Sequence, residues 1–112
     1  MNDDRARALL SAERSRVQAL LGATVDAGQE DRAAANESGE IADPAERLTA
    51  EEVDDAVAGS LRERLAAIDR AERRLDEGTF GYSIRSGLPI PDDRLEADPA
   101  AELTVGEAGQ EA

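Results

Sequence analysis

The sequence contains no cysteine, no histidine and no lysine, and each absence removes a class of function. Without cysteine the chain has no disulfide, no thiol redox chemistry and no thiolate ligand for a metal. Without histidine, cysteine and lysine, an acid–base pair would have to be formed by carboxylates, and no glycine-rich phosphate loop is present. Most carboxylates fall on the polar faces of predicted helices, which is typical of a solvated surface. We therefore expect a protein that is not an enzyme and that uses neither a metal nor a cofactor.

Aromatic side chains are almost as scarce, with one phenylalanine, one tyrosine and no tryptophan in 112 residues. Much of the apolar content is alanine, which favours helices but fills little core volume. A mainly α fold with a narrow apolar seam suits this composition better than a compact globular core.

The charge is strongly one-sided, with a net charge of −13 and thirteen basic residues that are all arginine. Such a surface repels phosphates, which argues against direct nucleic-acid binding and favours a basic partner surface. A lysine-free composition rich in alanine and arginine fits a GC-rich genome. The excess of acid also fits a salt-loving host, although codon bias alone explains the composition equally well.

Long apolar runs are missing too. No stretch approaches the roughly 20 apolar residues of a membrane span, and the opening "MNDDRARALL" does not resemble a signal peptide. We expect a cytoplasmic protein that does not contact a membrane.

Two segments have the apolar spacing of amphipathic helices. The first, residues 3–35, has Asn2 as a candidate N-cap. The second, residues 49–77, has a candidate capping box formed by Thr49 and Glu52. The predicted seam consists of Leu10, Val17 and Leu21 in the first helix and Leu61, Ile68 and Leu75 in the second, widened by Leu9, Leu20, Val57 and Leu65.

The segment 36–48 breaks the helical pattern between these two helices. Gly39 and Pro44 interrupt it, and Asp43 precedes a proline, which biases it away from helical geometry. Two long helices joined by a short break should fold back as an antiparallel coiled coil. We expect residues 1–77 to form a helical hairpin with its tip near 36–48. We expect a monomer, although the same apolar stripes would also suit a homodimer.

The final third of the chain differs in kind. Ile84, Leu88 and Ile90 alternate weakly with polar residues, which predicts a β-hairpin turning near Ser86 and Gly87. A short helix is expected to start near 98–99, where proline suits the first turn. We expect a small lobe over residues 78–105 and a disordered tail over 106–112.

The stretch "GTFGYSIRSGLPIPDDRLEADPAAELTVGEA" resembles the C-terminal half of the DksA/TraR family. That family's pattern approximates G-x-[YF]-G-x-C-x-x-C-G-x-x-I-x-x-x-R-L-x-A-x-P-x-A-x-x-C-x-x-C. The residues on its non-cysteine positions are Gly78, Phe80, Gly81, Gly87, Ile90, Arg94, Leu95, Ala97, Pro99 and Ala101. With the preceding coiled coil and the break, the resemblance extends over roughly residues 40–105. It implies a coiled coil followed by a small treble-clef lobe.

The four cysteine positions of that pattern are occupied by other residues, namely Ser83, Ser86, Thr104 and Glu107. Structural zinc requires four tetrahedral ligands that are mostly thiolate or imidazole. Hydroxyl groups are poor zinc ligands at neutral pH, and one carboxylate does not compensate. The resemblance therefore implies the shape of the lobe without its zinc.

Members of the DksA/TraR family bind RNA polymerase, with the lobe at the rim of the secondary channel and the coiled-coil tip near the active centre. The family's acidic tip pattern is close to D-P-x-D-R-A, and "DPAERL" is similar to it here. The resemblance implies a polymerase-facing tip formed by Asp43, Glu46, Arg47 and Leu48, and a rim contact at Arg94. It implies a non-catalytic transcription regulator whose partner is RNA polymerase. The alternative is a coiled-coil structural or dimerisation module that no longer binds polymerase.

Overall fold

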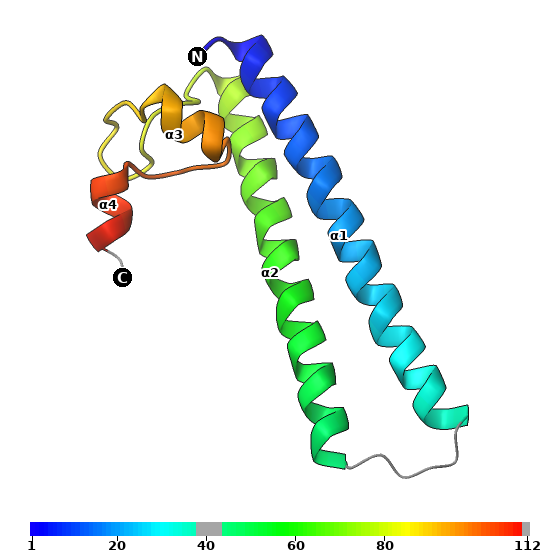
Figure 1. The fold of residues 1–112 in the computed structure, drawn as a ribbon. Coiled ribbons are helices and arrows are strands. Elements are labelled where there is room, and N and C mark those ends of the chain that lie inside the picture. Colours follow the sequence, from blue (N-terminus) through cyan, green and yellow to red (C-terminus); the bar gives the residue numbers. More distant parts are fainter. Residues whose placement is uncertain (38–43, 111–112) are drawn as a thin grey trace. The chain divides into compact units, whose positions relative to one another are not determined.

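The computed structural model describes the backbone of residues 1–37 and 44–110, and the side chains of residues 1–26 and 53–109. Four helices follow one another along the chain, and the described residues include no β-strand. These helices are α1 (Asp3–Glu37), α2 (Pro44–Glu77), α3 (Asp92–Ala97) and α4 (Val105–Gln110) (Figure 1). The mainly α prediction is confirmed. Within the described residues, neither long helix has an apolar stretch able to cross a membrane.

Helix α1 begins where the sequence predicts. The side chain of Asn2 accepts a hydrogen bond from the backbone N–H of Arg5 at 2.8 Å, as an N-cap residue does. Asp3 and Asp4 occupy the first turn, where the helix dipole favours negative charge. The helix runs to Glu37, two residues beyond the predicted end.

Helix α2 begins at Pro44, so the predicted start at residue 49 is wrong. Proline suits the first helical position because its fixed φ is helical and its missing N–H would be unpaired there anyway. Thr49 lies inside the helix, and the predicted capping box with Glu52 is therefore also wrong.

The end of α2 is a Schellman motif centred on Gly78, which has a left-handed φ of 77°. The N–H of Gly78 donates to the carbonyl of Leu75 at 3.3 Å, and the N–H of Thr79 donates to that of Arg74 at 2.8 Å. This turn starts the lobe directly after the helix.

The chain divides into two compact units, the first formed by Met1–Ser15 and Ala66–Ala112 and the second by Arg16–Leu65. In the first unit the start of α1 packs antiparallel to the end of α2 (Figure 1). Leu10, Ile68 and Leu75 are buried there as predicted, since each is at most 4% exposed. Ala6 and Ala71 complete the seam.

Three ion pairs, made by two arginines of α1, flank this seam. Arg7 pairs with Asp76 at 2.8 Å, and Arg14 pairs with both Asp69 and Glu72. Their order along the two helices is antiparallel.

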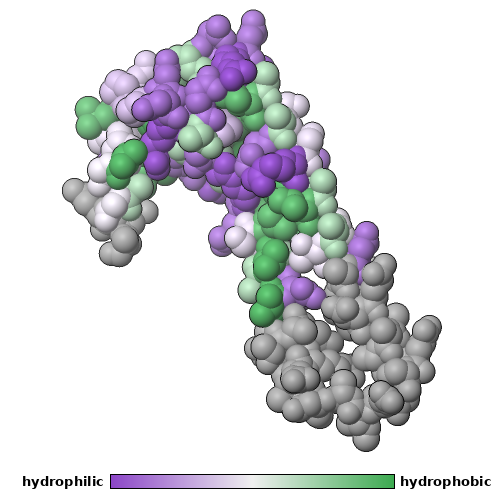
Figure 2. Space-filling model, in the orientation of Figure 1, coloured by the Kyte–Doolittle hydropathy of each residue, from purple (hydrophilic) through white to green (hydrophobic). Residues whose placement is uncertain are grey.

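In the second unit Val17 and Ala58 are buried, while Leu21, Leu61 and Leu65 are half-buried. Leu20 and Val57 are both 43% exposed, so the predicted widening of the seam by these two residues is wrong. Ala58, adjacent to Val57, takes the inward position and turns the valine outward. Figure 2 shows the resulting apolar side chains on the surface of the helices.

The lobe begins with a tight loop, residues 82–89, which we call the knuckle. One antiparallel bridge joins Tyr82 and Pro89, so the predicted β-hairpin is reduced to a single pair. The N–H of Ser83 donates to the carbonyl of Leu88 at 2.8 Å, and the N–H of Gly87 donates back to Ser83 at 3.0 Å. Gly87 has a φ of 74°, which closes the turn near the predicted place.

The short helix of the lobe is α3, and the predicted helix start near 98–99 is wrong. Pro91 stands at the N-cap position of α3, and two aspartates fill its first turn. Asp98 is extended, with φ −145° and ψ 90°, because a residue before proline avoids helical geometry. Leu95 of α3 packs with Ile90 and Ala101 in a small core that Met1 and Phe80 cover.

The structure also differs from the expected disordered tail, because α4 forms at Val105–Gln110. Its start is fixed by a capping box that the sequence analysis overlooked. The N–H of Glu107 donates to Thr104 Oγ1, and the N–H of Thr104 donates to Glu107 Oε1, both at 3.3 Å.

Candidate functional site

The four positions that carry cysteine in the family pattern come together in the lobe. The Ser83 hydroxyl donates to Glu107 Oε2 at 2.9 Å, and the Ser86 hydroxyl donates to Glu107 Oε1 at 3.2 Å. The Thr104 hydroxyl donates to Glu107 Oε1 at 2.9 Å. One carboxylate thus receives three hydroxyl groups, and we call these four residues the Glu107 cluster.

The serines of the cluster also organise the knuckle. Ser83 Oγ accepts hydrogen bonds from the N–H groups of Arg85 and Ser86 at 3.1 and 3.2 Å. Ser86 Oγ accepts one from the N–H of Leu88 at 3.2 Å. Each serine therefore accepts hydrogen bonds from backbone N–H groups of the turn and donates a hydrogen bond from its own hydroxyl to Glu107. Ser83 is 5% exposed, so this hydrogen bonding also satisfies a buried polar group.

The charge of Glu107 is favoured by these contacts. Partial burial raises the pKa of the Glu107 carboxyl, but the hydrogen bonds from Thr104, Ser83 and Ser86 outweigh burial and lower its pKa below the ordinary value. Only the ionised carboxylate can accept hydrogen bonds from all three hydroxyl groups with both of its oxygens. The cluster therefore consists of three hydroxyl groups that all donate hydrogen bonds to a single anion.

The Glu107 cluster does not suit zinc. It offers one carboxylate and three hydroxyl groups, whereas structural zinc sites are built from thiolate and imidazole. Among the described side chains, no group of three or more His, Cys, Asp or Glu residues is placed to hold a metal ion. What the arrangement does provide is a cross-link between the knuckle and α4.

A second charged cluster attaches the lobe to α2. Glu102 accepts two hydrogen bonds from Arg70, at 2.8 and 3.2 Å, and its Oε2 lies 3.4 Å from Arg74 Nη1. Hydrogen bonding from Arg70 lowers the pKa of Glu102 despite partial burial. Burial lowers the pKa of Arg74, whose Nη2 is buried without a hydrogen-bond partner among the described residues.

Arg94, the expected rim contact, has an internal partner. Its Nε donates to the carbonyl of Leu103 at 2.9 Å, and the side chain is half-buried. This bond joins α3 to the segment that leads into α4. The structure thus gives Arg94 a position inside the lobe, and a contact with polymerase stays a prediction.

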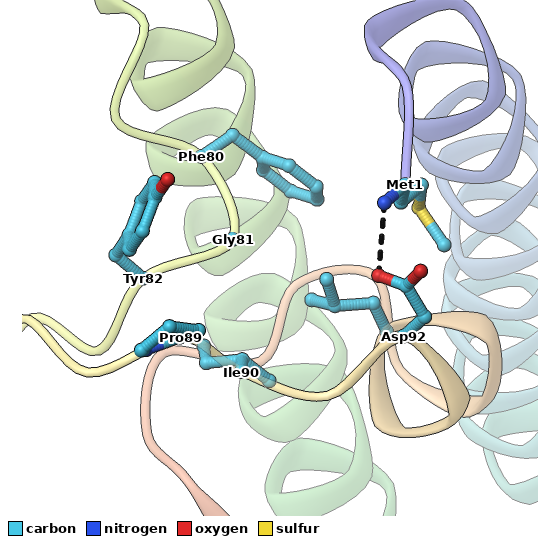
Figure 3. Close-up of a pocket in the computed structure, with 8 residues that line it drawn as sticks. Met1, Phe80, Gly81, Tyr82, Pro89, Ile90 and Asp92 are labelled. Carbon is cyan, nitrogen blue, oxygen red and sulfur yellow. Dashed lines mark hydrogen bonds and ion pairs between the residues drawn. The ribbon is translucent and has the colours of Figure 1, made fainter.

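The start of α1 closes the other side of the lobe (Figure 3). The Met1 amino group lies 2.9 Å from Asp92 Oδ1, and Arg5 pairs with Glu96 at 2.7 Å. Met1 and Phe80 line a hollow of about 200 Å³. No local sequence pattern signals these contacts, because they join residues 91 positions apart.

A larger hollow, of about 540 Å³, lies on the side of the lobe that faces α2. Arg74, Glu77 and Thr79 line it together with residues of the knuckle, among them Tyr82 and Ile84. Tyr82 and Ile84 are 50% and 60% exposed, so part of this surface is apolar.

The predicted tip residues lie outside the part of the chain whose side chains are described. Asp43 falls in the segment 38–43, for which no structure is described. Glu46, Arg47 and Leu48 fall within the backbone of α2, in its first turns. Their role stays a prediction.

Comparison with known proteins points in one direction. No family model matches the chain. It is 40% identical over 68 residues to the RNA polymerase-binding transcription factor DksA of Caulobacter vibrioides, a match covering 57% of this chain and 47% of that protein. It is 37% identical over 65 residues to general stress protein 16O of Bacillus subtilis, covering 58% of this chain and 40% of that protein. The matches thus span less than half the length of these relatives.

The fold agrees over a greater length. Transcription factor DksA2 from Pseudomonas aeruginosa superposes with a TM-score of 0.81 at 25% identity, covering 97% of this chain and 81% of that one. In sequence and in fold, the chain is similar to DksA proteins. Within the DksA family pattern, this chain has hydroxyl groups and a carboxylate at the cysteine positions, and these side chains still converge on one point.

Proposed function

We propose that this chain is a non-catalytic transcription regulator that binds RNA polymerase in the cytoplasm. The observation that carries the proposal is the agreement of fold with DksA2 over nearly the whole chain, together with 40% identity to a DksA named for binding polymerase. A net charge of −13 favours a basic docking surface and disfavours direct contact with DNA or RNA.

The finer mechanism assigns separate tasks to the lobe and to the tip. The lobe and the adjacent helices supply affinity at the rim of the secondary channel. The tip, with Asp43 and Glu46, approaches the active centre and supplies the effect on transcription. A carboxylate can act on a charged active centre only after the rest of the molecule has delivered it there, so affinity and effect should be separable.

The test measures binding and transcription side by side. Asp43→Asn removes one charge at nearly constant size and should leave polymerase affinity within about twofold of the parent while abolishing its effect in run-off transcription. Glu46→Gln should act in the same direction. Asp55→Asn, which removes a charge from an exposed position of α2, is the matched control. Full regulation by Asp43→Asn would refute the acidic-tip mechanism, and failure of the parent protein to bind polymerase would refute the proposed function.

A second candidate is a coiled-coil module that pairs with another copy of itself. The observation in its favour is the exposure of Leu20, Val53 and Val57 on the helices of the second unit, at 43%, 55% and 43%. Light scattering decides between the two. A concentration-independent monomer that captures polymerase supports the regulator, and a stable dimer that captures none supports the module.

A further inference from the structure

Helix α4 has little of its own to hold it in place. It is six residues long and contains Gly106 and Gly109, each of which disfavours a helix. Isolated helices of this length are not stable in water. None of its described residues is buried, and Val105 is 64% exposed. Its position therefore depends on contacts made by particular side chains.

Glu107 makes those contacts in two directions. Toward its own helix it completes the capping box with Thr104. Toward the knuckle its carboxylate oxygens accept hydrogen bonds from the hydroxyl oxygens of Ser83 and Ser86, at 2.9 and 3.2 Å. The same carboxylate therefore starts the helix and attaches it to the rest of the lobe.

We propose that Glu107 is a latch, whose ionised carboxylate holds α4 on the knuckle and whose loss of charge releases α4 while the rest of the lobe stays folded. Other contacts hold the remainder independently of Glu107. Arg70 binds Glu102 at 2.8 Å, and Ile90, Leu95 and Ala101 form a core. The latch replaces a metal cross-link with groups that all belong to the chain.

The direction of the pH response follows from the donors around Glu107. The groups that face it are the hydroxyls of Ser83, Ser86 and Thr104, together with the Thr104 amide. The charged side chains of the neighbouring segments are Arg85 in the knuckle and Glu102, which is bound to Arg70 and Arg74. A protonated Glu107 would have to donate where it now only accepts. Because its pKa is lowered, the latch is closed above the ordinary range of glutamate and opens as pH falls below that range.

The experiment uses the whole chain and two substitutions that separate the latch from the cap. Glu107→Gln keeps an oxygen for the capping box, which accepts Glu or Gln, but its amide nitrogen cannot accept the Ser83 proton. Thr104→Ala removes the capping hydroxyl and leaves the bonds from both serines to Glu107. Glu77→Gln, an exposed carboxylate near Tyr82, is the matched control.

Backbone Cα chemical shifts, followed by NMR from neutral to acid pH, report the state of α4 and of the knuckle. In the parent protein we expect the Cα chemical shifts of α4 to lose their helical values in acid. The chemical shift of Ser86 should change over the same pH range, while the chemical shifts of α3 stay helical. In Glu107→Gln, α4 and Ser86 should already have at neutral pH the chemical shifts that the parent protein shows in acid. Thr104→Ala should keep the coupled acid transition at the knuckle, and Glu77→Gln should behave as the parent.

Two results would overturn the latch. One is a Glu107→Gln protein whose α4 and knuckle shifts match the parent at neutral pH. The other is a parent protein in which α3, α4 and the end of α2 lose their shifts together in acid, since that is unfolding of the whole lobe. Neither readout requires polymerase, so the latch is tested separately from the proposed function.

Discussion

Two glycines, one inside α2 and one directly after it, show how backbone conformation decides the effect of one methyl group. Gly78 has a φ of 77°, and a Cβ added there would meet no atom within 4 Å. Gly59 lies inside α2, and a Cβ there would likewise meet nothing. Space is available at both positions, so only the conformation differs.

We predict opposite effects for the same substitution at these two sites. Gly78→Ala should destabilise the fold by about 1 kcal/mol, because alanine is strained at positive φ. Gly59→Ala should stabilise it by about 0.5–1 kcal/mol, because alanine loses less entropy in a helix. Urea denaturation followed by circular dichroism measures both. Equal effects of the two substitutions would contradict the Schellman ending of α2.

Glu102 gives a prediction of pH dependence at the residue scale. Its pKa is lowered, chiefly by hydrogen bonding from Arg70, so the native state prefers the ionised carboxylate. The stability it contributes is present above the ordinary glutamate pKa and is lost as pH falls through the lowered native value. Glu102→Gln should cost about 2 kcal/mol at neutral pH and less in acid, because it leaves Arg74 buried without a carboxylate. Denaturation at several pH values is the measurement, and a pH-independent cost would refute this assignment.

At the scale of elements, the seam of α1 and α2 was readable from the sequence wherever an apolar residue had no competitor. Leu10, Val17 and Ile68 are all 0% exposed, as their heptad spacing predicts. The spacing failed at Val57, because the neighbouring Ala58 takes the inward position. A stripe wider than one residue per turn does not say which of its members faces inward.

Ile68 and Val57 together supply a test of the helix packing. Ile68→Asp buries a charge without a partner and should cost at least 3 kcal/mol, enough to remove much of the helicity. Val57→Asp, at a position 43% exposed, should change stability by less than about 1 kcal/mol. Thermal melts followed by circular dichroism compare the two, and an unaltered melt of Ile68→Asp would count against the seam.

Helix starts were harder to predict from the sequence than the seam. Two T-x-x-E sequences occur in the chain. The one at Thr49 lies within a helix that had already started at Pro44, whereas the one at Thr104 starts α4. The cap at Thr104 is also supported by Ser83 and Ser86, which donate to Glu107 from some twenty residues away, and no local pattern shows that support.

At the scale of the whole molecule, charge is the dominant feature. The net charge of −13 implies self-repulsion in the folded state, which salt screens within about 10 Å at 0.1 M. The surface ion pairs weaken with salt as well, but exposed pairs contribute little. We therefore predict that the melting temperature rises between dilute buffer and about 1 M sodium chloride. A falling melting temperature would mean that the ion pairs of Arg7 and Arg14 outweigh the repulsion.

The Glu107 cluster also has a kinetic consequence. A lobe that needs a metal reaches its native state through a bimolecular step, so its rate of maturation depends on the free metal concentration. Here every donor and the acceptor are part of one polypeptide, separated by 24 residues at most. Closure is unimolecular and limited by the search of a short loop, which is fast. Newly synthesised chains should therefore mature at a rate that does not depend on the free metal concentration.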